Sequence, residues 1–134
     1  MKTINTLIAD IENLIVKGGS DIPDEIYDHL GKAVAESIRS SMSREHEPRL
    51  RMSNIGQCSR KTWYSINAPE EKEPLSASAY LKFMFGHILE DVLLFLAEAA
   101  GHEVTGRQDE QDIQGIKGHR DAVIDGVLVD VKSA

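Results

Sequence analysis

The stretch that decides the fold is Gly118-His-Arg-Asp-Ala-Val-Ile-Asp-Gly-Val-Leu-Val-Asp-Val-Lys-Ser-Ala134. Two short apolar runs flank Asp125-Gly126, a strong signal for a two-residue β-hairpin turn. Such a turn folds Asp121 back toward Asp130 across the hairpin. Alternate residues of a strand share a face, so Asp130 and Lys132 point the same way. The sequence therefore predicts two carboxylates and an ammonium on one patch of sheet, an arrangement that suits a divalent cation and a phosphate.

Three motifs in this chain resemble those of the PD-(D/E)XK nuclease superfamily. Asp121 followed by a hairpin and Asp130-Val131-Lys132 matches the Asp…Asp/Glu-x-Lys pattern that names the family. Upstream, Phe85-Gly86-His87-Ile88-Leu89-Glu90 is similar to the Gly-x-x-x-Glu/His helix of its RecB-like branch. Still further upstream, the run 52–64 resembles the Ser-x-[small]-x-x-Cys-x-Arg-x-x-Tyr segment of phage-type exonucleases. The motifs stand in the family order and cover roughly residues 52–134.

This resemblance implies a metal-dependent deoxyribonuclease. The implied ligands of Mg²⁺ or Mn²⁺ are Glu90, Asp121, Asp130 and the backbone carbonyl of Val131, oxygen donors of the kind that these ions prefer. Lys132 resembles the family lysine that activates the attacking water, so Lys132, Asp121 and Asp130 are the implied catalytic residues. The expected mode of cleavage is that of an exonuclease rather than an endonuclease, in DNA recombination, repair or degradation. The alternatives are that Asp130 is an ordinary strand acid paired with Lys132, and that Glu90 is solvated.

Positive charge gathers in the segment that carries the Ser/Cys/Arg/Tyr motif. The chain has a net charge of −7, yet six of its 15 basic residues lie in 39–61. Basic and aromatic side chains together bind the DNA backbone and stack on bases. We therefore expect contacts to a DNA partner from Ser53, Arg60, Lys61, Tyr64 and His119.

Several nearby residues have ordinary structural explanations. His119 is equally well explained as a structural histidine, and Ser53 as a residue that caps the helix that follows. Trp63 is expected in the core of that short helix, and Asp125 is expected to serve the hairpin turn alone.

The single cysteine, Cys58, excludes an internal disulfide framework and fits a reducing cytoplasm, that of the bacterial host if a phage encodes the protein. Some RecB-like nucleases hold an iron–sulfur cluster through a cysteine at this place and three more beyond the core. One cysteine cannot build such a cluster, so we expect Cys58 to be a buried structural residue. No apolar run approaches the roughly 20 residues of a membrane span, and no signal-peptide segment opens the chain.

Periodicity predicts the order of the elements. Helices are expected over residues 3–17, from about 24 to 38, from Ser53 or Ser59 to Ile66, and over about 78–100. Strands are expected over about 102–113, 116–124 and 127–132. The predicted fold is α/β, an α+β-like restriction-endonuclease core, with a helical region over 1–50 and a partial nuclease core over 51–134.

The family core continues with a second helix and a last strand, whereas this sequence stops two residues after Lys132. We therefore expect an uncovered sheet face and an unpaired strand edge beside Asp130. A further C-terminal segment, a companion polypeptide or a second copy of the chain would cover them. A second interpretation is an inactive nuclease fold that serves as a DNA-binding or assembly module. A third is a helical interaction protein that works through residues 1–50, but the intact acid, acid and lysine set favours the nuclease.

Overall fold

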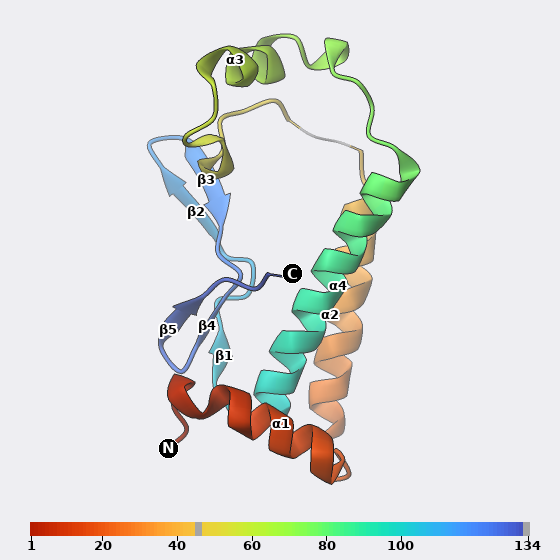
Figure 1. Ribbon diagram of the computed structural model, residues 1–134, viewed down its shortest axis with the longest axis vertical. Coiled ribbons are helices and arrows are strands. Elements are labelled where there is room, and N and C mark those ends of the chain that lie inside the picture. Colours follow the sequence, from red (N-terminus) through yellow and green to blue (C-terminus); the bar gives the residue numbers. More distant parts are fainter. Residues whose placement is uncertain (45–46, 133–134) are drawn as a thin grey trace.

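The protein has a mixed α/β fold in which helices lie to one side of small antiparallel sheets (Figure 1). The computed structural model describes residues 1–44 and 47–132. The helices are α1 (Leu7–Lys17), α2 (Asp24–Met42), α3 (Ser59–Asn67) and α4 (Ala77–Ala99), and the short 3-10 turns are η1 (Ile4–Thr6), η2 (Met52–Asn54) and η3 (Pro69–Glu71). The strands are β1 (Val104–Thr105), β2 (Glu110–Ile113), β3 (Ile116–His119), β4 (Ala122–Ile124) and β5 (Val127–Val129).

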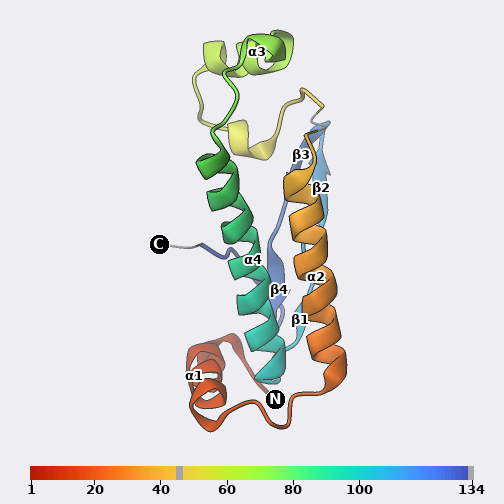
Figure 2. The ribbon, with the colours of Figure 1, turned by 90° about the vertical axis from the view of Figure 1, so that its right-hand side faces the viewer.

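The long helix α4 is the central element of the fold. It begins where the Ser76 hydroxyl accepts a hydrogen bond from the backbone N–H of Ala79 at 3.2 Å, and it ends before Gly101, whose φ of +89° suits glycine. Figure 2 shows α2 running beside α4, with the strands behind the two helices. The predicted helices over 3–17 and 78–100 are confirmed, while α2 runs four residues beyond its predicted end.

The strands differ from the prediction in their continuity. The three-stranded sheet has the order β1-β4-β5, and β2 and β3 form a separate hairpin. The expectation of unbroken strands over 102–113 and 116–124 is therefore wrong. Gly106 and Gln108 adopt φ values of +60° and +53°, which turn the chain out of the extended conformation. An ion pair between Arg120 and Asp109 joins the two chain segments at this interruption. β5 also ends at Val129 rather than near residue 132.

The hydrophobic core is small and lies between the C-terminal half of α4 and the three-stranded sheet. Its buried members come from α4 and β4, and partly buried residues of the N-terminal turn, α1, β1 and the last strand surround them. The buried residues are Leu94, Ala97, Ala122 and Ile124. Consequently α4 and the β4–β5 hairpin, which pack together through this core, are the elements that fix the positions of the side chains around them.

A buried histidine joins this core to α1. The ring of His102 places Nδ1 at 2.6 Å from Asp125 Oδ2 and Nε2 at 3.2 Å from Asp10 Oδ2. Asp125 also accepts the backbone N–H of Glu103 at 3.1 Å. The hydrogen bond from His102 is the main reason that the pKa of Asp125 lies below its usual value. The expectation that Asp125 serves the turn alone is therefore wrong, because it also holds the end of α4 and the hairpin together.

The molecule has a larger accessible surface than a compact monomer of the same mass. Its accessible area is 9861 Å², against about 7,000 Å² for a compact monomer of this mass. On β5, Leu128 is exposed, and within the described range this strand has β4 as its neighbour on one side and no strand on the other. Within the described residues β5 is therefore an edge strand of its sheet, and the expected unpaired edge beside Asp130 stays a prediction. Within the same range, no helix has the length and apolar character needed to cross a membrane.

We expect Leu94→Ala to lower the free energy of unfolding by roughly 2–5 kcal/mol, because it leaves a cavity between α4 and the sheet. Leu81→Ala, on the half-exposed side of the same helix, should change it by no more than about 0.5 kcal/mol. Urea unfolding of both variants checks this expectation. Equal losses would show that stability does not depend on this core.

Candidate active site

Two carboxylates meet beside the β4–β5 hairpin. The register pairs Ala122 with Val129, so Asp121 and Asp130 follow as the next residues across the two chains. Asp121 Oδ2 accepts the backbone N–H of Val131 at 2.7 Å, and the Asp121 side chain lies close enough to Asp130 to affect its pKa. The predicted juxtaposition of the two acids is therefore present. Val131 reaches Asp121 through its N–H, whereas the sequence predicted a role for its carbonyl.

Lys132 belongs to the same cluster. Its ammonium donates a hydrogen bond to Asp130 Oδ2 at 2.5 Å, and both side chains are exposed. This contact is the main reason that the pKa of Asp130 is lowered, and the neighbouring Asp121 side chain is the second. Conversely, Asp130 raises the pKa of Lys132. An exposed ion pair of this kind adds little stability, so both groups are available to other partners.

Glu90 supplies a third acid from α4. It is 9% exposed, which contradicts the alternative of a solvated helix acid. Its Oε1 accepts a hydrogen bond from the side-chain amide of Gln108 at 2.5 Å. Burial raises the pKa of Glu90 above its usual value, and the nearby charge of Asp121 raises it further. Glu90 is thus a buried carboxyl group that lies close enough to Asp121 to be affected by its charge.

A cleft of about 270 Å³ opens beside Glu90, between α2, α4 and the strand segments. The residues that line it all carry polar or ionisable side chains: Glu36, Ser37, Ser40, His87, Glu90, Asp91, Gln108 and His119. The structure therefore places His119, which the sequence predicted as a DNA contact, on the same cleft as the acid of α4. The role of Gln108 could not be predicted from the sequence, because a glutamine within a predicted strand carries no signal that it will reach a helix.

The donor set has the chemistry of a site for a hard divalent cation. Carboxylate oxygens are the ligands that Mg²⁺ and Mn²⁺ prefer, and Glu90 has an amide rather than a cation as its hydrogen-bond partner. In residues 1–44 and 47–132, however, no group of three or more His, Cys, Asp or Glu side chains converges closely enough to hold an ion. The side chains therefore suit such an ion in their chemistry. Asp121 and Asp130 lie next to each other, and Glu90 is hydrogen-bonded to Gln108.

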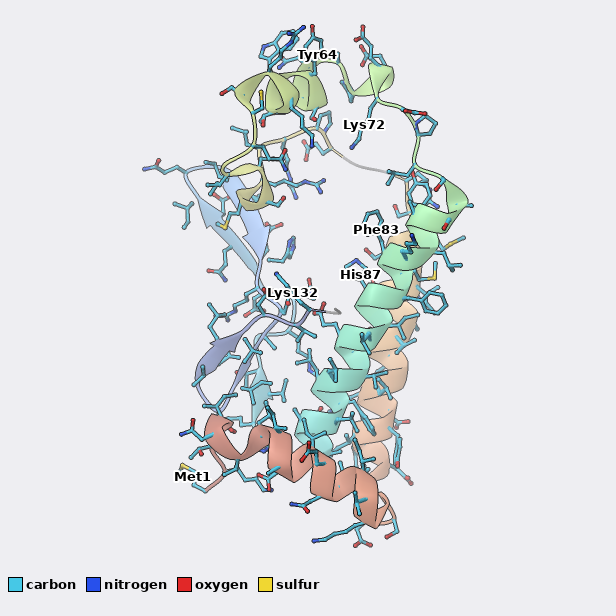
Figure 3. The ribbon with its side chains drawn as sticks, viewed as in Figure 1. Met1, Tyr64, Lys72, Phe83, His87 and Lys132 are labelled. Atoms are coloured by element: carbon cyan, nitrogen blue, oxygen red, sulfur yellow. The ribbon has the colours of Figure 1, made fainter. Side chains whose placement is uncertain are left out.

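The other predicted DNA contacts lie on a different part of the molecule. Figure 1 shows α3 beyond the N-terminal end of α4, far from α1 and from the end of β5. Arg60 and Lys61 are exposed on α3, and Tyr64 lies on its outer side (Figure 3). The Arg60 guanidinium lies 5.9 Å from the centre of the Tyr64 ring. Ser53 lies in η2, where it does not cap α3.

Two expectations about the same segment are wrong. Trp63 is 57% exposed and meets Tyr64 edge to face, whereas the sequence predicted a core residue. Cys58 is exposed at the N-cap of α3 rather than buried. Backbone N–H groups of Lys61 and Arg60 lower the pKa of its thiol. Both corrections have one cause: no other element of the described chain covers these faces of α3.

No family model matches this sequence, and neither the curated proteins nor the solved structures give a match. The assignment of a function therefore depends on the residues and their geometry.

We expect Glu90→Gln to stabilise the protein at neutral pH. A carboxyl group whose pKa is raised by folding lowers the free energy of unfolding as the pH rises from its unfolded pKa to its folded pKa. The amide variant lacks this titration and can still accept from Gln108, so its advantage should appear above that window and vanish below it. Thermal unfolding between pH 4 and 8 measures the effect. Glu36→Gln, an exposed acid of the same cleft, is the control and should show no such trend.

Proposed function

We propose that this protein is a metal-dependent DNA nuclease of the PD-(D/E)XK type, acting on phosphodiester bonds as an exonuclease. The observation that carries this proposal is the meeting of Asp121 and Asp130 beside Lys132. The buried Glu90, which is influenced by the charge of Asp121, adds an acid from a second element. The positions match the three motifs in the sequence, and the hairpin between the two aspartates matches the order that the family pattern requires.

Each residue has a defined role in this proposal. Asp121, Asp130, Glu90 and the carbonyl of Val131 would hold Mg²⁺ or Mn²⁺. Such an ion, when bound, lowers the pKa of a water molecule and offsets negative charge on the phosphate. The Lys132 ammonium would orient the attacking water and stabilise the charge that develops on the phosphate oxygens. Its raised pKa keeps it charged at neutral pH, as this role requires.

Electrostatics favour a cation at this place. Lys132 offsets the charge of Asp130. Burial raises the pKa of Glu90, and the charge of Asp121 raises it further. A phosphodiester brings further negative charge and would be repelled by the acids alone. A divalent cation removes both repulsions, which is a reason to expect metal and DNA to bind together.

A second candidate function is a DNA-binding or assembly module built on the same fold. It is favoured by the absence, within the described residues, of three side chains converging on one ion. It is also favoured by the exposed edge of β5 and the large accessible area, which suit a companion polypeptide or a second copy. This module would bind DNA without hydrolysing it.

We expect Asp130→Asn to abolish Mn²⁺ binding and to reduce DNA cleavage by several orders of magnitude while the fold remains intact. Lys132→Ala should reduce turnover as strongly but change the metal affinity much less, because the lysine acts on the transition state. Calorimetric titration and cleavage of labelled DNA measure the two effects. Asp28→Asn, an exposed acid of α2, is the control. Wild-type cleavage by the Asp130→Asn variant would refute the nuclease site.

We expect DNA binding to be strongly salt-dependent, because phosphate contacts from Arg60 and Lys61, both exposed on α3, would release counterions. Replacing Arg60 and Lys61 together by Ala should reduce the slope of log affinity against log salt by the amount that corresponds to roughly two phosphate contacts. Fluorescence anisotropy over a range of salt concentrations gives the slope. Replacing Lys17 and Lys32 instead removes the same charge far from α3 and should leave the slope unchanged. A slope that is equally unchanged in the first variant would place the DNA elsewhere.

A further inference from the structure

The helix α4 presents a mixed surface beside the buried acid. Phe83, Gly86, His87 and Glu90 follow the i, i+3, i+4, i+7 spacing of a single helix face. At one end of this stripe Glu90 is buried, whereas at the other end Phe83 is 59% exposed. Figure 3 shows Phe83 and His87 projecting from the same side of α4, toward the strands. His87 also lines the cleft next to Glu90, so the stripe leads from open surface into the candidate active site.

Gly86 keeps this stripe open. A Cβ atom added at this position would meet no atom within 4 Å. Glycine in the interior of a helix is less stable than alanine, so a close internal contact would be the usual reason to find it there. No such contact exists among the described residues. Gly86 therefore borders open space one helical turn from Phe83.

The chemistry around Phe83 distinguishes it from the apolar surface on another side of the same helix. Leu81, Phe85 and Leu89 form an exposed row of apolar side chains there, the kind of surface that suits another protein element. Phe83 instead lies one turn from the His87 imidazole and two turns from the Glu90 carboxyl group. Lys72, which follows η3, extends toward the same space (Figure 3).

An exposed aromatic ring beside positive charge is the combination with which proteins bind single-stranded nucleic acid, and Lys72 supplies the positive charge on this side of α4. The ring stacks on a base, and the cations attract the backbone. The bases of a duplex are covered on both sides by their neighbours, so an unpaired base is the ligand that can offer a free face to Phe83.

We propose that Phe83, with the open space at Gly86, is a stacking site for one unpaired base of a DNA strand whose phosphodiester reaches Glu90. This inference rests on the proposed nuclease function and adds the substrate class, a single-stranded or frayed end. Seven residues of helix separate the two side chains, a rise of about 10 Å. That distance corresponds to about three stacked nucleotides between the bound base and the acid.

The test uses the full chain with Ca²⁺ in place of Mn²⁺, so that a divalent cation offsets the repulsion between the acids and the phosphodiester while binding is measured apart from cleavage. The probe is a 12-nucleotide oligodeoxythymidine with one 2-aminopurine, whose fluorescence reports stacking, and a blunt duplex serves for comparison. Phe83→Leu keeps an apolar side chain without a ring and should weaken binding of the single strand by about 5- to 100-fold. Phe83→Trp should bind as the wild type does. Phe85→Leu, at an equally exposed ring on another side of α4 (61%), is the matched control and should not change binding.

Gly86→Ala gives a second measurement, in which the stability of the protein and its affinity for the single strand should change in opposite directions. The variant should unfold at a higher temperature, because alanine favours the helix, and yet bind the single strand more weakly. Wild-type affinity in both Phe83→Leu and Gly86→Ala would overturn the stacking site while leaving the nuclease proposal in place. Equal losses in Phe83→Leu and Phe85→Leu would also overturn it, because they indicate a general apolar contact. Failure of the wild-type chain to bind any DNA would overturn both proposals.

Discussion

The contact between His102 and Asp125 constrains the turn on which the rest of the site depends. Asp125 and Gly126 take φ values of +49° and +79°, the conformation of a tight hairpin turn. A slip of one residue in the pairing of β4 and β5 would turn every side chain of one strand to the opposite face. It would also separate Asp121 from Asp130. The buried ring of His102 and the N–H of Glu103 occupy the two oxygens of Asp125, and so hold the turn in one register.

The pKa values of the hairpin acids and of the acid on α4 are shifted in opposite directions. Asp125 and Asp130 have basic partners, and these hydrogen bonds lower their pKa values. Glu90 is buried, and this burial raises its pKa even though the hydrogen bond from the Gln108 amide acts in the opposite direction. Because a raised carboxyl pKa opposes folding in the charged form, α4 carries an unfavourable group at the point nearest the hairpin acids. The small core around Leu94 and Ile124 has to offset this effect.

Local signals allowed much of this fold to be predicted from the sequence. The Ser76 cap and Gly101 mark the ends of α4, and Asp125-Gly126 marks the hairpin, because each acts within a few residues. The interruption of the strands was not predictable in this way, since it accompanies a contact between Gln108 and Glu90 in separate elements. Sequence also indicates which side chains prefer burial but not which surface is available to cover them. Trp63 on α3 is exposed for that reason.

The two hydrogen bonds of the His102 ring join it to residues at very different separations along the chain. The pair with Asp125 spans 23 residues, whereas the pair with Asp10 spans 92. Loop-closure entropy grows with the logarithm of this length, so the longer loop is less favourable by about 1 kcal/mol. Other things being equal, the end of α4 and the hairpin therefore associate at a smaller entropic cost than either does with α1. Detachment of the N-terminal helix would leave the Asp125 contacts to His102 and Glu103 in place, which makes the geometry of the acids independent of the order in which the molecule assembles.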